Sequence, residues 1–265
     1  GNNDLGIVLK NNGSAVFKDT VFVQYKIDNG SWVKDTAVYT NLGIGESDTF
    51  FFSTKWNISA AGTFDVCAEI SPTVSGDPDS LTGDDICEVK CVGRTGTFVI
   101  DANGNGDYRT FTQAINSLSC GIAGPIKFEV KAGTYRERLT LTPVLGASAQ
   151  NSITFEGVDK DSVFIEYSGT SSLPATVLID DVDYLTFKEV SIVNQGSQVS
   201  CGFWLRENAH HVTIEDCQVF LDSVSANYTT AGILVANSLT SSSAVIPGNT
   251  SEDLLIKNNL IVGGS

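Results

Sequence analysis

One pattern of apolar and polar residues recurs along the second half of the chain, at residues 153–158, 185–190 and 212–217, and with altered apolar positions at 254–259. In each copy an apolar, a polar and an apolar residue are followed by two polar or bend residues and then by a position expected to be buried. The alternation predicts a strand, and the two-residue break predicts a bend. Repeats of this length indicate a solenoid. We therefore expect a parallel β-helix, in which each turn stacks its apolar strands on the turn before.

The end of the sequence has the pattern of an unfinished solenoid. The last repeat runs into Gly263, Gly264 and Ser265, which look like the entry to another turn. A solenoid normally ends in an element that caps its open core, and none follows. We therefore expect the chain to be part of a longer protein.

Short β-rich runs separated by turn residues fill the first third of the chain. The Asn-Gly pair at Asn29 and Gly30, between two such runs, is the strongest hairpin signal. Six or seven strands at this spacing predict an immunoglobulin-like β-sandwich. The runs lie at residues 5–9, 21–27, 32–39, 48–53, 63–70 and 86–92.

Three segments of this region, residues 5–12, 43–52 and 61–70, resemble the adhesion-type β-sandwich modules that occur in tandem on bacterial surface proteins. The resemblance implies a spacer or binding module without an active site.

A linker at residues 91–96 leads into a strand, a Gly-rich turn and a run at 110–118 with apolar residues at helical spacing. A further strand and a Gly-x-Tyr-x-Glu segment follow, formed by Gly133, Tyr135 and Glu137. This succession resembles the start of the pectin methylesterase-like right-handed β-helices. The resemblance implies that the short helix covers the open N-terminal end of the coil, where strand edges would otherwise be exposed.

Residues 120–125 and 146–153 extend the resemblance to the β-helix modules of large secreted proteins in bacteria that use type IX secretion. It covers most of residues 97–265. The sequence thus predicts an all-β chain. An immunoglobulin-like β-sandwich occupies residues 1–93, and residues 94–265 form the N-terminal turns of a right-handed parallel β-helix with a short capping helix.

The composition narrows the range of partners. Hydrophobic residues make up 42% of the chain, which allows a real core, and the formal net charge is −15. Nucleic acid and anionic membranes are excluded as partners because both require a basic patch. No run of 18 apolar residues occurs, so we expect no membrane insertion.

The six cysteines indicate an oxidising compartment. Folding the strand-like segments around Cys67 and Cys87 as a hairpin brings these two residues together and predicts a disulfide, with Cys91 as the less expected partner. Zinc is disfavoured because Cys87 and Cys91 have no matching second pair of ligands. Cys217 takes the place of Val190 in the repeat and is expected to be a small buried residue.

The pectin methylesterase resemblance implies paired carboxylates supported by glutamines and an arginine, yet the motifs do not match residue by residue. The glutamine-bearing strand falls at residues 201–205, where Cys201 stands in place of the glutamine. The next motif has only a shortened form around Asp222, and the third has no counterpart before residue 265. We expect no esterase catalytic residues and no cofactor in this chain.

Other acidic clusters have simpler explanations than a metal site. Asp180, Asp181 and Asp183 invite comparison with the calcium ligands of polysaccharide lyases, but they precede a strand and fit a solvated turn. Glu215 lies one turn away from Lys188, which indicates a stacked polar bend.

The segment from Asp101 to Asp107 resembles the start of a calcium loop, but Thr112 occupies the twelfth position, where a glutamate is required. His210 and His211 precede a strand and have no nearby third ligand in the sequence. The sequence therefore predicts no metal site.

These observations favour a structural and adhesive role in a large protein that is extracellular or displayed at the cell surface. The expected partners are a polysaccharide or cell-surface glycan, contacted through side grooves of the coil and exposed aromatics such as Tyr228, and other modules of the same long chain. The alternative is a carbohydrate-active enzyme, pectinesterase-like or polysaccharide-lyase-like, whose active site lies outside these 265 residues.

Overall fold

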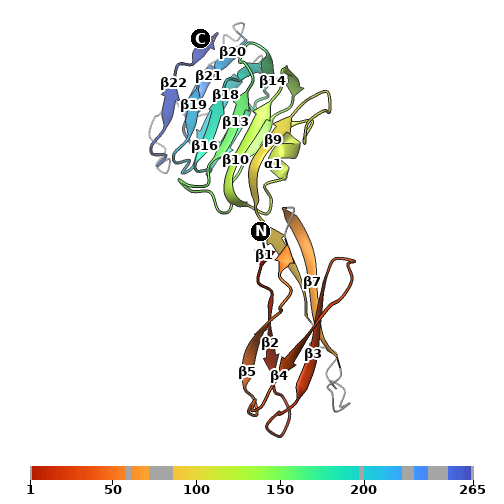
Figure 1. Ribbon diagram of the computed structural model, residues 1–265. Coiled ribbons are helices and arrows are strands. Elements are labelled where there is room, and N and C mark those ends of the chain that lie inside the picture. Colours follow the sequence, from red (N-terminus) through yellow and green to blue (C-terminus); the bar gives the residue numbers. More distant parts are fainter. Residues whose placement is uncertain are drawn as a thin grey trace. The chain divides into compact units, whose positions relative to one another are not determined.

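The computed structural model describes residues 2–57, 61–71, 86–196, 200–222, 230–237 and 250–263. The chain divides into two compact units, Gly1–Val92 and Gly93–Ser265, and each is described by itself. Strands account for nearly all the regular structure of both units (Figure 1).

The first unit consists of antiparallel strands. A four-stranded sheet has the order β4-β3-β7-β8, and two strand pairs, β2-β5 and β1-β6, accompany it. All six predicted strands form. The bounds are β1 Asn2–Asn3, β2 Gly6–Lys10, β3 Thr20–Ile27, β4 Val33–Val38, β5 Ser47–Phe51, β6 Trp56–Asn57, β7 Gly62–Ser71 and β8 Ile86–Val92.

A small apolar core holds the first unit together. Alternate residues of β3, among them Val23 and Tyr25, point into it and are buried with Leu9 and Phe52. The rings of Tyr25 and Phe52 pack edge to face with centroids 4.6 Å apart. The predicted hairpin joins β3 to β4, with Gly30 donating its backbone N–H to the carbonyl of Ile27 (2.9 Å). Assignment to the immunoglobulin-like class stays a prediction.

The second unit is a parallel β-solenoid of about four turns, as the repeat predicts. Three parallel sheets run along it, and each complete turn contributes one strand to each sheet. The first sheet contains β9 (Arg94–Ile100), β10 (Ile122–Val130), β13 (Ile153–Gly157), β16 (Leu185–Lys188), β19 (Thr213–Glu215) and β22 (Leu255–Lys257). The second contains β11 (Gly133–Arg136), β14 (Val163–Tyr167), β17 (Ser191–Asn194), β20 (Gln218–Leu221) and β23 (Leu260–Val262). The third contains β12 (Leu139–Leu141), β15 (Ala175–Asp180), β18 (Ser200–Arg206) and β21 (Thr230–Val235).

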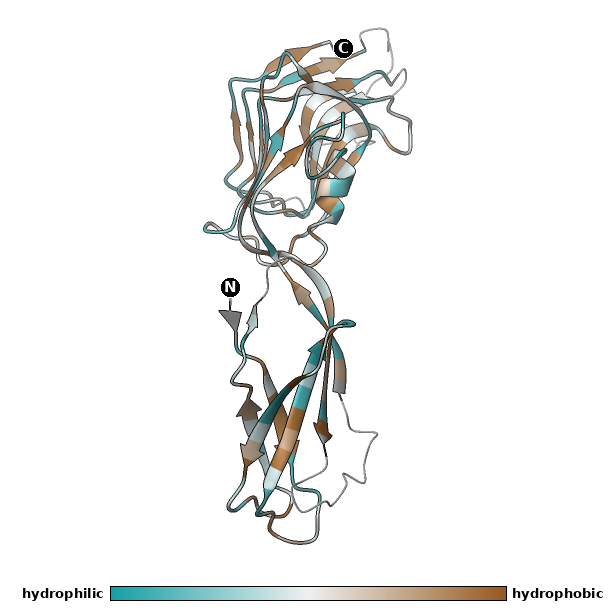
Figure 2. Ribbon diagram, turned by 45° about the vertical axis from the view of Figure 1, so that its right-hand side comes forward, coloured by the Kyte–Doolittle hydropathy of each residue, from teal (hydrophilic) through white to brown (hydrophobic). Residues whose placement is uncertain are grey.

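The register of the first sheet follows the repeat residue by residue. Ile153 pairs with Leu185, Thr186 with Thr213, and Thr213 with Leu255, all in parallel. Hydrophobic and hydrophilic residues alternate along these strands (Figure 2). The alternation places one set in the core and the other on the outer face.

Aromatic side chains stack along the core. Phe155 lies 4.7 Å from Phe128 on one side and 5.1 Å from Phe187 on the other, ring centroid to centroid, with nearly parallel ring planes. All three are fully buried, and Ile214 continues the row. Such ring pairs add to the stabilisation that burial already provides.

Left-handed residues make the bend between the first and second sheets. Glu189, Asp216 and Asn258 have φ values of 52°, 53° and 57°. Asp and Asn tolerate this region better than most residues, because their short polar side chains can bond locally. The bend in each repeat is therefore made by one residue with a left-handed backbone conformation.

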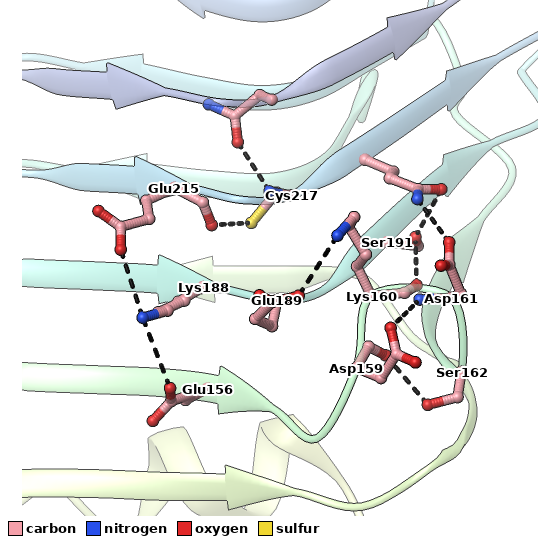
Figure 3. Close-up of polar contacts among 12 residues, drawn as sticks. Glu156, Asp159, Lys160, Asp161, Ser162, Lys188, Glu189, Ser191, Glu215 and Cys217 are labelled. Carbon is pink, nitrogen blue, oxygen red and sulfur yellow. Dashed lines mark hydrogen bonds and ion pairs between the residues drawn. The ribbon is translucent and has the colours of Figure 1, made fainter.

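The first repeat departs from the pattern, and here the sequence prediction is wrong. Val158 is expected in the core, but its side chain is 62% exposed. A longer connection joins β13 to β14, so that Val163 takes the buried place beside Val190 of the next turn. Two bonds from later turns hold this connection (Figure 3): Ser191 donates to the carbonyl of Lys160 (2.7 Å), and the amide of Gln218 donates to a carboxylate oxygen of Asp161 (2.6 Å).

Val190, Cys217 and Asn259 occupy one position on successive turns, as predicted. Asn259 is bonded within the stack. Its amide nitrogen donates to the carbonyl of Ile214 (2.7 Å), and its amide oxygen accepts the backbone N–H of Cys217 (2.9 Å). A polar side chain thus replaces the apolar one without leaving its amide unpaired.

A short helix, α1 (Phe111–Asn116), lies at the start of the solenoid and is shorter than the predicted run of 110–118. Glu137 caps its N-terminus by accepting the backbone N–H groups of Phe111 (2.9 Å) and Thr112 (2.8 Å). The hydroxyl of Tyr135 donates to a backbone carbonyl (2.9 Å), and its ring packs against Phe111 with centroids 5.1 Å apart. Tyr135 and Glu137 of the Gly-x-Tyr-x-Glu segment therefore fasten the helix to the first turn.

Candidate functional site

The outer face of the first sheet carries a ladder of alternating charges. Glu156, Lys188, Glu215 and Lys257 stand in register on β13, β16, β19 and β22. The Lys188 ammonium lies 3.3 Å from the Glu215 carboxylate and 3.8 Å from that of Glu156 (Figure 3). A hydrogen bond to Glu215 is the main reason why the pKa of Lys188 is raised. The ladder is the predicted stacked polar surface, and it offers both donors and acceptors to solvent.

A groove of about 240 Å³ opens on this face over the first turns of the solenoid. Lys127, Glu129 and Glu156 line it, with the exposed side chain of Val158 at one side. The Lys127 ammonium lies 2.7 Å from Glu156 and 3.4 Å from Glu129, and the hydrogen bond to Glu156 raises its pKa. An ammonium held between two carboxylates presents charged hydrogen-bonding groups to a ligand.

A second polar group lies on the third sheet. Arg206 at the end of β18 donates through Nε to Asp180 of β15 (2.8 Å), and its Nη2 contacts the other carboxylate oxygen. The guanidinium also lies 5.6 Å from the ring centroid of Trp204. The hydrogen bond from Arg206 lowers the pKa of Asp180. This pair is therefore a charged, bidentate contact.

Arg138 lies between β11 and β12. Its Nη1 donates to the hydroxyl of Thr140 (2.7 Å), while its buried Nε has no hydrogen-bond partner within the described ranges. Burial lowers the pKa of Arg138, nearby Tyr167 acts in the opposite direction, and the positive charge of Arg206 lowers it further. Sequence reasoning missed this side chain, because nothing in its local pattern reveals the missing partner.

Cys201, where the resemblance led us to expect the esterase glutamine, is buried in this chain. Cys201 is fully buried on the third sheet, in an apolar cluster with Ala175, Leu178 and Trp204. Burial raises the pKa of the Cys201 thiol to about 12. A protonated thiol in such surroundings is a poor nucleophile, and it lacks the amide donors of a glutamine.

Asp222 follows β20 directly, and its backbone N–H donates to the carbonyl of Asn194 one turn earlier (3.1 Å). Ser223, the last residue of the shortened motif, lies outside the described residues. Asn194 is fully buried and is a residue that sequence reasoning missed. Its amide donates to the carbonyls of Pro174 (2.8 Å) and Cys201 (2.9 Å). These bonds connect the end of β17 to the start of β15 and to β18.

The three aspartates at the end of β15 and directly after it have different roles. Asp180 pairs with Arg206, Asp181 occupies a left-handed bend with φ 57°, and Asp183 accepts the backbone N–H of His210 (2.9 Å). His211 stacks on the ring of Tyr184 (4.4 Å). Among the described residues no group of three or more His, Cys, Asp or Glu is placed to hold a metal ion.

The calcium-like segment forms a turn held by its own side chains. Asp101 accepts the backbone N–H of Asn103 (2.9 Å), and Asp107 accepts that of Val99 (2.7 Å). Both carboxylates are therefore occupied by turn hydrogen bonds, as expected for the connection between β9 and α1.

A disulfide joins Cys67 to Cys87 across β7 and β8, with Cα atoms 4.0 Å apart. Cys91 and Cys120 are disulfide-bonded as well, and Cys201 is a free buried thiol. The predicted glycan-contacting aromatic, Tyr228, lies outside the residues that the structure describes.

Two comparisons, one with curated sequences and one with solved structures, find pectinesterases. No family model matches the chain. A probable pectinesterase/pectinesterase inhibitor 23 from Arabidopsis thaliana is 27% identical over 129 residues, which cover 46% of this chain and 22% of that protein. The chain thus spans about a fifth of the relative's length. A solved structure of pectin methylesterase from carrot matches with a TM-score of 0.28 and 13% identity, covering 65% of this chain and 85% of that one.

This chain is similar to pectinesterases. The parallel β-solenoid itself is seen directly in the sheet order. In the part of the chain that the structure describes, no helix has the length and apolar character to cross a membrane.

Proposed function

We propose that this chain is an extracellular, glycan-contacting segment of a large bacterial surface protein, and that its solenoid binds polysaccharide without cleaving it. The observation that carries the proposal is the groove over Lys127, Glu129 and Glu156, continued by the charge ladder along the same face. The pectinesterase relative supports a carbohydrate of the pectin class.

The geometry of a solenoid suits an extended polymer. Neighbouring strands of a sheet lie about 4.8 Å apart, so equivalent side chains recur at that interval along the coil. A sugar chain laid across β13, β16, β19 and β22 would meet carboxylates and ammonium groups in alternation. Both kinds of group hydrogen-bond to hydroxyls, and charged partners make the stronger bonds.

The first unit fits the role of a spacer. We infer that it is an adhesion-type immunoglobulin-like module, that the solenoid is right-handed, and that both belong to a type IX-secreted protein. The Cys67–Cys87 disulfide supports an oxidising, extracellular compartment. Other modules of the same chain would then display the solenoid away from the cell.

Calorimetric titration with polygalacturonate, methyl-esterified pectin and neutral galactan tests the proposal. We expect binding of at least one glycan, and Lys127→Gln should weaken it about fivefold or more through loss of charged hydrogen bonds. Lys34→Gln on β4 is the matched control, since it removes one exposed lysine from the first unit. Absence of binding to every glycan refutes the function, and binding that is insensitive to Lys127→Gln refutes the groove as its location.

The second candidate is a carbohydrate-active enzyme, and the similarity to the Arabidopsis pectinesterase favours it. Cys201 in the place of the glutamine and the shortened motif at Asp222 oppose it within this chain. The assay is release of methanol from methyl-esterified pectin, which the binding function does not produce.

A further inference from the structure

Lys131 is the basic side chain of the groove that has no carboxylate partner within the described residues. Six other basic side chains of the solenoid form ion pairs, namely Lys127, Arg136, Lys160, Lys188, Arg206 and Lys257. The four that form none in the described part of the chain are Arg94, Arg109, Lys131 and Arg138. Of these four, Lys131 alone lines the groove, and its side chain is exposed. Its ammonium is therefore accessible to a ligand.

The backbone on both sides of the Lys131 side chain is held in place. Lys131 directly follows β10, and alternation along the strand places it on the same face as Lys127 and Glu129. Its N–H donates to the carbonyl of Ile100 (2.9 Å), and its own carbonyl accepts the hydroxyl of Tyr135 (2.9 Å). The lysine stem therefore starts from a fixed point at the groove.

Val158 gives the groove an apolar contact beside Lys131. The register that pairs Val130 with Gly157, extended by one residue, brings Lys131 next to Val158. The N–H of Val158 donates to the carbonyl of Val130 (2.9 Å), and its side chain is 62% exposed. A sugar ring carries apolar C–H groups as well as hydroxyls, so it can cover an exposed valine while its polar groups reach the charged side chains.

The charged side chains of the groove leave one cation unused. The Lys127 ammonium lies 2.7 Å from Glu156 and 3.4 Å from Glu129, so these two carboxylates share it. Lys188 adds a contact of 3.8 Å to Glu156. Lys131 is the remaining positive charge. The two carboxylates keep lone pairs that can accept sugar hydroxyls, and they repel a densely charged polyanion.

We propose that the groove binds one free uronate residue of a polysaccharide, with its carboxylate on Lys131 and its ring against Val158. Its hydroxyls donate to Glu129 and Glu156. The inference rests on the proposed glycan-binding function and names the ligand class of the same groove. It makes Lys131 the residue that distinguishes the free acid from its methyl ester, because esterification removes the charge that pairs with the ammonium.

Calorimetric titration of the full chain with oligogalacturonate and its methyl ester tests the uronate site. We expect the free acid to bind about fivefold more tightly, the effect of one charged contact that is partly screened by solvent. Lys131→Gln should make the two affinities equal, and Lys131→Arg should keep the preference. The matched control is Arg109→Gln, which removes a positive charge that is likewise exposed and without an ion pair but does not line the groove.

Two further measurements examine the ring contact and the kind of anion. Val158→Ala should weaken binding of acid and ester alike, by about threefold, because an apolar contact does not depend on charge. Sulfated dextran should bind more weakly than oligogalacturonate, since Glu129 and Glu156 repel a dense row of negative groups. A tighter complex with sulfated dextran would overturn the carboxylate assignment, because it would show a general response to anionic polymers.

The outcomes separate this site from the general function. Equal affinity of the unmodified chain for acid and ester, or a preference that survives Lys131→Gln, overturns the uronate site. The proposed function still stands in that case if Lys127→Gln weakens glycan binding. Absence of binding to both forms and to neutral galactan refutes the proposed function and the uronate site together.

Discussion

Removing the carboxylate of Glu137 tests whether the Gly-x-Tyr-x-Glu segment is structural. Glu137 accepts the backbone N–H groups of Phe111 and Thr112 and also contacts the Thr112 hydroxyl (2.5 Å). These amides belong to the first turn of α1, where no carbonyl within the helix can reach them. Glu137→Ala leaves them without their acceptor.

The magnitude follows from the contacts. Loss of a helix cap costs about 0.5–2 kcal/mol, and a hydrogen bond to a charged group contributes about 1.5–3 kcal/mol. Thr110 still accepts the backbone N–H of Gln113 (3.1 Å), so the cap is only partly lost. Because Glu137 is half-exposed, water replaces some of what is removed. We expect Glu137→Ala to reduce the free energy of unfolding of the solenoid by about 2 kcal/mol, and Glu137→Gln, which keeps one acceptor oxygen, by about half of that.

The assay combines urea unfolding, followed by circular dichroism, with amide hydrogen exchange. Exchange at Phe111 and Thr112 should accelerate in Glu137→Ala, whereas exchange in β16 should change only as much as global stability does. A variant with wild-type unfolding and unchanged exchange at these two amides would refute the capping role. The segment would then need a different explanation, with contact to a ligand as the first candidate.

Three further predictions concern the solenoid. Gly157→Ala should destabilise it by more than about 1 kcal/mol in urea unfolding, because a Cβ there would lie 1.9 Å from a backbone oxygen. Cys201 and Cys217 should resist iodoacetamide in the native state, since burial raises both thiol pKa values to about 12, and rapid labelling would contradict their burial. The chain should release no methanol from methyl-esterified pectin, and turnover that Asp222→Asn abolishes would show that the shortened motif still builds an active site.

The solenoid was predictable because its signal is local and repeated. In a strand the side-chain period is two, so Ile153, Phe155, Leu185 and Phe187 reveal their shared face from spacing alone. The error at Val158 has an equally local cause. A repeat read from sequence assumes equal bend lengths, and the longer connection of the first turn is held by side chains from later turns.

For the first unit, the sequence predicts the strands and one disulfide but not the arrangement of the sheets. Its strands follow from the apolar runs and the turn at Gly30, and the Cys67–Cys87 disulfide follows from folding two adjacent strands as a hairpin. The arrangement of sheets does not follow in this way, since β3 pairs with β7, and even the nearest paired residues, Ile27 and Val66, are 39 positions apart in the sequence (66 − 27). Such pairing depends on packing, which a local pattern does not contain.

The groove was less predictable than the fold, because its side chains come from different turns. Lys127 lies between Glu129 and Glu156 only once β10 and β13 are stacked. Asn194 likewise looks like a strand-end residue until its amide is found between two carbonyls. Both conclusions require the stacking of turns, which brings together residues that are far apart in the sequence.

The acidity of the chain does not argue against an acidic ligand. At physiological ionic strength charges are screened over about 8 Å, so a bound carboxylate responds mainly to the charged side chains nearest to it, such as Lys127 of the groove, and only weakly to the net charge of −15. The two effects have opposite salt dependence. If the nearby basic side chains dominate, added salt weakens the complex with oligogalacturonate, and if the net charge dominates, added salt strengthens it. The sign of the change in affinity between low and physiological salt therefore decides whether local charge or overall charge governs binding.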